Sequence, residues 1–446
     1  MPSRDSGEAG LRVRSPDSAA PAAARPFRRH TTVQDTACPP PTPPLLAPRI
    51  AWTMLLALVS GFALSQAYRT ITAIIATGLR AEFGLSAQAL GAFAGAFAFS
   101  FGSMQLFMGV GIDLYGVRRT LLTAFPLTIA GSLLSALAPG YGAVLLGQVL
   151  IGVGCAPAFL VCTVFIARYF PAARFAMVSG VAMGVGGLGM LFTGTPLAWL
   201  VQHSSWRMGF GVLAGVAVLA WLLIWWKVHE PAQPQHLQAA SRESIGSAVR
   251  GFGALFLLPH TVGIMLLALT TYASFLTLRG LWLGPLLIER HGYSLVASGN
   301  VAVIASLVSL FSPAFFGRLD PGPAHRRRWI MGFTALLSGL FLAIGLLHQE
   351  WLDVAGPIAV GLLSGYMVLQ YADVRSAYPT AMTGRAMAVF TMALFLGVAL
   401  MQWLTGLAAS LASASGADPY VAVMLTISAL LAAGVVSFRL LPAPAH

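Results

Sequence analysis

The segment Gly109-Val110-Gly111-Ile112-Asp113-Leu114-Tyr115-Gly116-Val117-Arg118-Arg119 joins two long apolar runs, residues 87–112 and 120–138. Its glycines allow two helix ends to approach each other closely. Asp113 can pair with arginines, or bind the N-terminus of a neighbouring helix. The segment therefore predicts a short, charged turn between two apolar helices.

Outward from this turn, apolar runs of similar length follow one another along most of the chain. Each is long enough to cross about 30 Å of hydrocarbon at about 1.5 Å per residue. We expect twelve transmembrane helices, near 50–79, 87–112, 120–138, 141–167, 176–201, 208–227, 256–288, 295–317, 329–348, 353–373, 385–410 and 419–438.

The composition supports a multi-pass membrane protein and excludes a soluble enzyme. Of the 446 residues, 57% are hydrophobic and only 9% are charged, against about 25% charged in soluble domains. The net charge of +12 is spread between apolar runs, so we expect no nucleic-acid partner. No Gly-x-x-x-x-Gly-Lys-Ser/Thr loop is present, so we expect no ATPase and no other enzyme. The cysteines and histidines form no metal motif, and no cofactor is expected.

Basic residues indicate the orientation. Of the 26 Lys and Arg residues, 21 fall on the side that holds both termini, and only Arg80, Arg207 and Arg290 fall on the other. The positive-inside rule then predicts that both termini are cytoplasmic, in a bacterial inner membrane. The expected organisation is a disordered, Pro-rich cytoplasmic tail (1–48), a six-helix bundle (49–228), a cytoplasmic central loop (229–255), a second six-helix bundle (256–440) and a short tail (441–446).

The two predicted bundles are weakly related to each other at an offset of 208 residues. Gly84-Leu85-Ser86 corresponds to Gly292-Tyr293-Ser294, and Arg118-Arg119 corresponds to Arg326-Arg327. A period of this length indicates a duplicated bundle, which predicts two pseudo-symmetric halves.

The turn after the second run resembles the signature G-x-x-x-D-R-x-G-x-R-R of the major facilitator superfamily, with Leu114 in place of a basic residue. Arg168-Tyr169-Phe170-Pro171 and Trp206-Arg207 are similar to other stretches of that family. The resemblance implies an all-α membrane fold of twelve helices in two bundles, and transport by alternating access. It also implies that a conformational latch is formed by Gly109, Asp113, Gly116, Arg118 and Arg119.

Two arginines lie deep within predicted spans, Arg69 in the first and Arg279 in the seventh. A charge at such depth costs at least about 2.5 kcal/mol, and no carboxylate lies near the middle of any predicted span. We therefore expect a substrate anion between the arginines, as in the organophosphate:phosphate antiporters that the chain resembles. The alternative is that both arginines bond backbone carbonyls. Further candidates for contact with the substrate are Gln66, Tyr68, Gln148, Tyr272, Trp282, Gln370, Tyr371 and Gln402.

These features favour a secondary transporter for a small organic anion, working as a monomer in the lipid bilayer. Its further partner would be a coupling ion or a counter-substrate, and exchange or symport through a shared site is favoured because no mid-membrane carboxylate is present. Proton-coupled efflux of drugs or metabolites is the main alternative. A copper importer, suggested by Met104 and Met108, and a non-transporting sensor or assembly protein are weaker ones.

Overall fold

The computed structural model describes residues 47–171, 174–229, 255, 257–378 and 380–442. The predicted tail 1–48 and the predicted loop 229–255 therefore fall almost wholly outside the described residues. Within those ranges every regular element is a helix.

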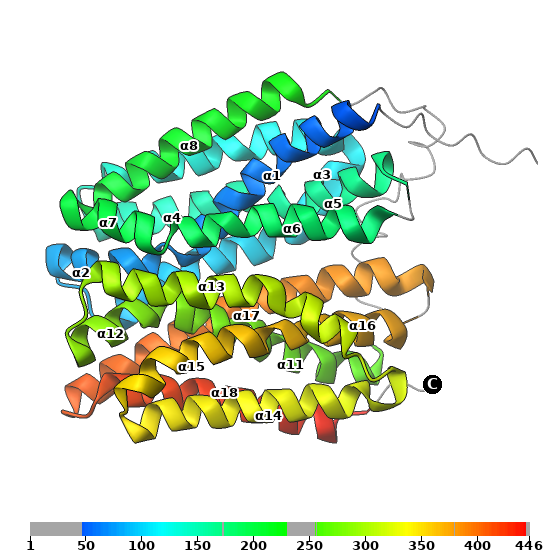
Figure 1. Cartoon of the computed structure of the whole chain (residues 1–446). Helices are drawn as coiled ribbons and strands as arrows, with labels where there is room; N and C mark the ends of the chain where they lie inside the picture. The colour runs from blue at the N-terminus through cyan, green and yellow to red at the C-terminus, as the bar shows by residue number, and fades with distance from the viewer. Residues whose placement is uncertain (1–46, 172–173, 230–254, 256, 379, 443–446) are drawn as a thin grey trace, which may run out of the picture. The chain divides into compact units, whose positions relative to one another are not determined.

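The first half of the chain contains α1 (Pro48–Thr70), α2 (Thr72–Phe83), α3 (Ala87–Ala136), α4 (Tyr141–Cys155), α5 (Ala158–Tyr169), α6 (Phe175–Phe192), α7 (Thr195–His203) and α8 (Trp206–Lys227). The second half contains α11 (Pro259–Thr277), a π-helical turn η2 (Leu278–Trp282), α12 (Leu283–His291), α13 (Leu295–Arg318), α14 (Pro323–Leu347), α15 (Glu350–Leu363), a 3₁₀ turn η3 (Ser364–Tyr366), α16 (Met367–Ala377), α17 (Thr380–Ala414) and α18 (Pro419–Leu440). Figure 1 shows that α1 to α8 lie together, as do α11 to α18.

In the described parts of the chain, eleven helical stretches are long and apolar enough to cross a membrane. The remaining predicted span, 120–138, is the third along the chain and forms the second arm of α3. Gly116 divides α3 with φ 82° and ψ 171°, so the predicted turn at residues 109–119 is a sharp kink between two helical arms. Side chains such as Leu219 and Phe107 are 66% exposed, as expected where lipid replaces water. The protein is thus a multi-pass helical membrane protein.

The pseudo-symmetry of the two halves is confirmed at the level of helix ends. Gly84 and Gly292, 208 residues apart, both end a helix in the left-handed region, with φ 62° and 68°. Two residues later, Ser86 and Ser294 each cap the next helix by accepting a bond from the backbone N–H three residues on, at 3.2 and 3.1 Å. The same local chemistry therefore starts the second and the eighth spans.

Helix breaks are repeated as well. The first span is interrupted at Ile71 and the seventh at Leu278–Trp282, while the fourth is interrupted at Ala156-Pro157 and the tenth at Ser364–Tyr366. Each pair is related by the offset of 208. Interrupted membrane helices are tolerated where the freed backbone faces protein or a cavity, and in transporters they mark the centre of the bundle.

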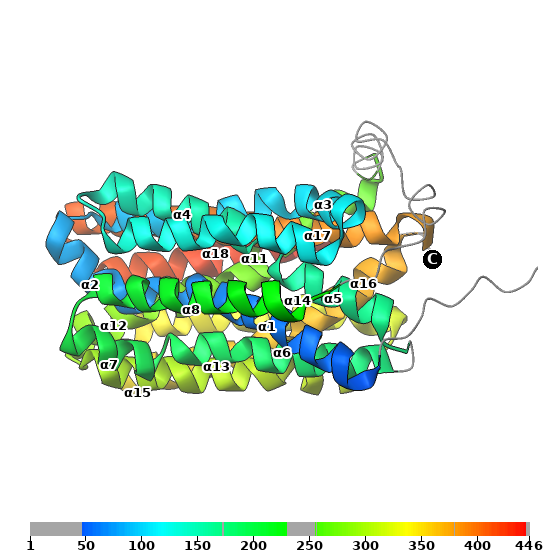
Figure 2. The same ribbon diagram turned by 90° about the horizontal axis from the view of Figure 1, so that it is seen from above.

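We call the end of the bundle that holds Pro48 and Leu440 the proximal end, and the opposite end the distal end (Figures 1 and 2). Several contacts between the halves lie distally. Arg80 of α2 donates to Glu289 of α12 at 2.7 Å, and Thr195 bonds Asn300 at 2.5 Å. A Cβ added at Gly284 would collide with the carbonyl oxygen of Ala73. The halves are therefore in tight contact at the distal end.

Candidate functional site

Arg69 lies one residue before the end of α1, next to the helix break, and its guanidinium group lies between aromatic rings from both halves. Its Cζ is 4.6 Å from the ring centroids of Phe101 in α3 and of Phe395 in α17. Two cation–π contacts of this kind hold the group without neutralising its charge.

The hydrogen bonds of Arg69 are few. Nη2 donates to Ser65 Oγ at 3.2 Å, and Nη1 reaches the Tyr272 hydroxyl at 3.5 Å. Nε is buried without a partner. A guanidinium has five N–H donors, so most of those on Arg69 are not used by the protein contacts described.

Arg279 lies in the π-helical turn and is only 1% exposed. Its Nε donates to Ala302 O at 3.1 Å and to Ser306 Oγ at 2.8 Å. Its Nη2 crosses to the other half and donates to Met190 O at 3.0 Å, while Nη1 has no partner. The alternative raised from the sequence, bonding to backbone carbonyls, therefore describes much of the environment of Arg279.

The two arginines belong to adjoining helix segments. A Cβ at Gly280 would lie 2.9 Å from the carbonyl oxygen of Arg69, so the backbone beside Arg279 packs directly on α1. The side chains diverge from this crossing to different partners. The bonds described for both arginines end on hydroxyls and carbonyls, none on a carboxylate, so two positive charges remain uncompensated by those partners.

The other candidates divide into two groups. Tyr272 contacts Arg69 and packs edge-on against Phe395. Gln66 donates to Met190 Sδ at 3.7 Å, Gln370 accepts from Thr271 at 3.0 Å, and Tyr371 packs on Phe390. Tyr68 donates to Ser132 inside the first half, and Trp282 donates to Thr405 inside the second. Tyr272 therefore bonds one of the two arginines across the halves, whereas the contacts described for the other five stay within their own half.

Gln148 and Gln402 are buried amides with unused bonding capacity. Gln148 is 1% exposed and neither its Nε2 nor its Oε1 has a partner, and Oε1 of Gln402 also lacks one. Reasoning from sequence missed Ser65, Phe101 and Phe395. The two phenylalanines carried no signal that would distinguish them among the 26 in the chain.

The expected latch is only partly described. Gly116 makes the kink, Arg118 Nη2 donates to Trp225 O at 2.9 Å, and Arg119 is exposed. A Cβ at Gly109 would make only an ordinary van der Waals contact, with Leu160 at 3.9 Å, so the helices do not approach closely enough at this position to require a glycine. The Asp113 side chain lies outside the described residues.

The corresponding turn of the second half has a complete ion pair. Arg326 donates to Asp320 through Nε at 3.0 Å and through Nη2 at 2.6 Å. These bonds from Arg326 hold the pKa of Asp320 below its usual value. Gly322 precedes the next helix with φ 79° and ψ 169°, nearly the conformation of Gly116.

The fold, the duplicated turns and the paired breaks agree with a family comparison. Residues 57–401 match the model of the Major Facilitator Superfamily. The chain belongs to the major facilitator superfamily. Among curated members, it is 25% identical over 277 residues to a hexuronate transporter of Bacillus subtilis, covering 62% of this chain and 60% of that protein. It is 27% identical over 163 residues to a D-galactonate transporter of Escherichia coli, covering 36% of this chain and 38% of that protein.

Solved structures of the superfamily share the fold. A D-xylose-proton symporter superposes with a TM-score of 0.69 at 16% identity, covering 88% of this chain and 98% of that one. A bacterial homologue of the lysosomal transporter Spinster, in an inward-facing and unoccupied conformation, gives 0.66 at 16% identity, covering 88% and 96%.

Proposed function

We propose that this superfamily member is a secondary active transporter that moves a small organic anion across a bacterial inner membrane by alternating access. The observation that carries the proposal is the pair Arg69 and Arg279 at the crossing of the first and seventh spans. Arg69 is half-buried and Arg279 buried, and neither has a carboxylate among its described partners. An anion with a carboxylate or phosphate group supplies a negative charge opposite the two guanidinium groups. Its oxygens accept hydrogen bonds from the N–H groups that the protein leaves unused. The curated relatives whose names mention hexuronate and galactonate support this class of substrate.

The two arginines have different parts in the proposal. Arg279 donates three hydrogen bonds to the protein, one of them to the opposite half. It therefore fixes how the first and seventh spans cross and adds a positive electrostatic potential to the site. Arg69 is held mainly by ring faces, so it is the residue that contacts the anion. Because Phe101 and Phe395 belong to different halves, alternating access changes the surroundings of Arg69 when the halves move apart.

The orientation follows from the positive-inside rule, with both termini cytoplasmic and the distal end facing outward. The contacts at the distal end then close the outward-facing side of the protein. Exchange or symport of the anion through a shared site, by a monomer, remains the favoured mode.

A hydrophobic drug or metabolite is the second candidate substrate. The observation in its favour is the aromatic cluster of Phe101, Phe395 and Tyr272 around Arg69. Such rings favour flat apolar ligands as well as cations. The two candidate substrates predict different effects of replacing Arg69, because an anion needs its guanidinium group and a cationic drug does not.

The test is a thermal-shift screen of the purified protein against organic anions and cationic drugs, repeated with Arg69→Lys and Arg279→Lys. We expect anions to stabilise the wild type, and Arg69→Lys to weaken this effect at least tenfold in midpoint concentration, because lysine lacks the bidentate fork. Arg279→Lys should lower the melting temperature even without a ligand. Stabilisation by cationic drugs alone, with Arg69→Lys responding like the wild type, would overturn the anion proposal.

A further inference from the structure

The last three residues of α12 are Glu289, Arg290 and His291, and all three make polar contacts at the distal end. Glu289 accepts from Arg80 of the other half at 2.7 Å and from the Tyr420 hydroxyl at 2.6 Å. Arg290 and His291 instead turn into the second half. One helix turn therefore connects the closure between the halves with a separate polar cluster.

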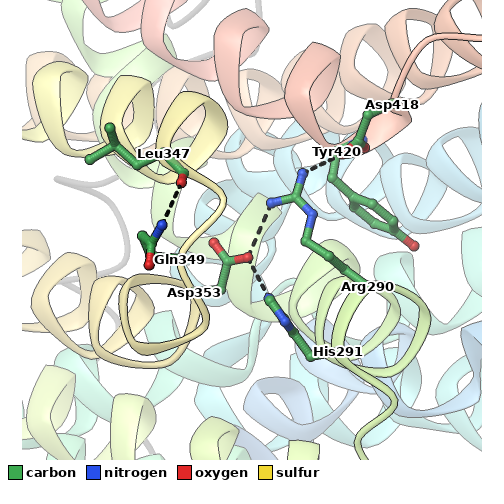
Figure 3. A network of polar contacts seen from close by, with 7 residues as sticks. All are labelled: Arg290, His291, Leu347, Gln349, Asp353, Asp418 and Tyr420. Carbon is green, nitrogen blue, oxygen red and sulfur yellow. Dashed lines mark hydrogen bonds and ion pairs between the residues drawn. The ribbon is translucent and has the colours of Figure 1, made fainter.

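The centre of that cluster is the carboxylate of Asp353, in the first turn of α15 (Figure 3). Its Oδ2 accepts from Arg290 Nη1 at 3.1 Å and bonds His291 Nε2 at 2.7 Å. Its side chain is 0% exposed, and its Oδ1 is buried without a partner. Arg290 also donates to Asp418 Oδ2 at 2.6 Å. Asp353 is the first residue of the predicted span 353–373, and the fold buries it although it lies near a helix end.

The charges of this cluster do not balance unless a proton is added. Arg290 supplies one positive charge against the two carboxylates, Asp353 and Asp418. Burial opposes ionisation of Asp418, but the bonds from Arg290 and from Tyr420 N–H prevail and hold the pKa of Asp418 below its usual value. With a neutral His291 the cluster carries one net negative charge. Asp418 is 35% exposed and meets water, but Asp353 is fully buried and the side chains of Arg290 and His291 are only 11% and 13% exposed. An unbalanced charge in such a place is costly.

Other charged or titratable groups at the distal end have their own partners or lie at other helix ends. They are Arg80 and Glu82 of α2, Tyr141 of α4, His203 of α7, Arg207 of α8, Glu289 of α12, Tyr293 before α13, His348 after α14, Glu350 of α15 and Tyr420 of α18. Arg207 forms an ion pair with Glu82. Arg80 and Tyr420 bond Glu289, and Tyr293 donates to Glu350 at 2.9 Å. None of the contacts described for these groups reaches Asp353, whose described partners are Arg290 and His291, and of these two the histidine is the one that can gain or lose a proton near neutral pH.

We propose that His291, with Asp353 as its counter-ion, is a proton-binding site whose occupancy favours closure of the distal end. A carboxylate only accepts hydrogen bonds, so a neutral His291 carries its hydrogen on Nε2, and the incoming proton from water goes to Nδ1. The bond from Nε2 to Asp353 then becomes charge-assisted and stronger. Without that proton, the net negative charge repels Glu289 on the same helix turn and loosens the end of α12 that holds Arg80.

This inference extends the proposed transport function, but its test needs no substrate, so either proposal can fail alone. Spin labels are placed on Leu137→Cys and Ser415→Cys, two exposed distal positions in different halves, in a protein carrying Cys38→Ser. The native Cys155 and Cys162 are buried. The distance distribution between the labels is then measured from pH 5.5 to 8.5.

We expect the short-distance, distally closed population to grow as the pH falls from 8.5 to 5.5. His291→Gln keeps a donor to Asp353 but cannot titrate, so its distribution should not change with pH. Asp353→Asn removes the counter-ion and should reduce the change in the closed population over this pH range. The matched control is His203→Gln, since His203 is a distal histidine that contacts Trp199 instead.

The proposal is overturned if the wild type shows no response to pH, or if His291→Gln responds as the wild type does. It is equally overturned if His203→Gln abolishes the response, because the proton would then bind elsewhere. If the label distances respond to sodium at constant pH, and this response is absent in Asp353→Asn, the cluster binds a metal cation and the proton proposal is overturned. Should Asp353→Asn fail to fold, His291→Gln and His203→Gln still decide the outcome.

Discussion

At the scale of single residues, the buried arginines differ in the hydrogen-bond acceptors that surround them. Arg326 meets the carboxylate of Asp320 through two nitrogens and is mostly buried, so its charge is balanced. Arg279 meets carbonyls and a hydroxyl, which orient the guanidinium but leave its charge in place. The first arrangement stabilises a turn, and the second gives the positive centre to which we propose that a ligand binds.

The pair Asp320–Arg326 leads to a prediction about stability and pH. Because the folded protein lowers the pKa of Asp320, its contribution is present above the unfolded pKa of about 3.9 and is lost as the pH falls through the lower folded value. Asp320→Asn should therefore lower the free energy of unfolding at pH 7 by about 1–2 kcal/mol. Melting curves of both proteins should converge below about pH 4. The exposed Arg328→Gln serves as a control, and an unchanged gap at pH 3 would contradict the assignment.

At the scale of elements, close approach between helices of different halves depends on missing side chains. A Cβ at Gly284 of α12 would collide with the carbonyl oxygen of Ala73 in α2, whereas nothing lies within 4 Å of a Cβ at Gly211 in α8. Both glycines are helical, so their intrinsic effect on the helix is the same. The difference between them is the distal contact alone.

Gly284→Ala should therefore open the distal end, at a cost of about 1–3 kcal/mol in the closed conformation. We expect the labels at positions 137 and 415 to move apart on average, and the melting temperature to fall. Gly211→Ala should leave both unchanged or raise stability slightly, since alanine favours a helix. Equal behaviour of the two variants would show that α2 and α12 are not tightly packed.

At the scale of the whole molecule, the distribution of basic residues predicts orientation. Arg119 is exposed at the proximal end, and Leu137 is 79% exposed at the distal end. With the proximal end cytoplasmic, a membrane-impermeant maleimide should label Leu137→Cys in intact cells and Arg119→Cys only after permeabilisation. Both variants carry Cys38→Ser. The reverse pattern would place the termini outside.

The sequence by itself indicated the apolar spans, with ends that differ from those of the structure by several residues, and the duplication, because these depend on local properties. Hydrocarbon thickness sets the length of each run, and caps such as Ser86 and Ser294 act within one turn. Gly116 supplies the positive φ of the kink at the place where the sequence predicted a turn.

Tertiary structure decided which polar residues meet. Residues 69, 101 and 395 are brought together from three spans, and whether a tyrosine such as Tyr68 faces the crossing or the core of its own half depends on helix rotation. Asp353 is the first residue of a predicted span, and its contacts with Arg290 and His291 exist only because α12 packs on α15. Contacts of this kind depend on the packing of distant segments, so a pattern read along a single helix cannot contain them.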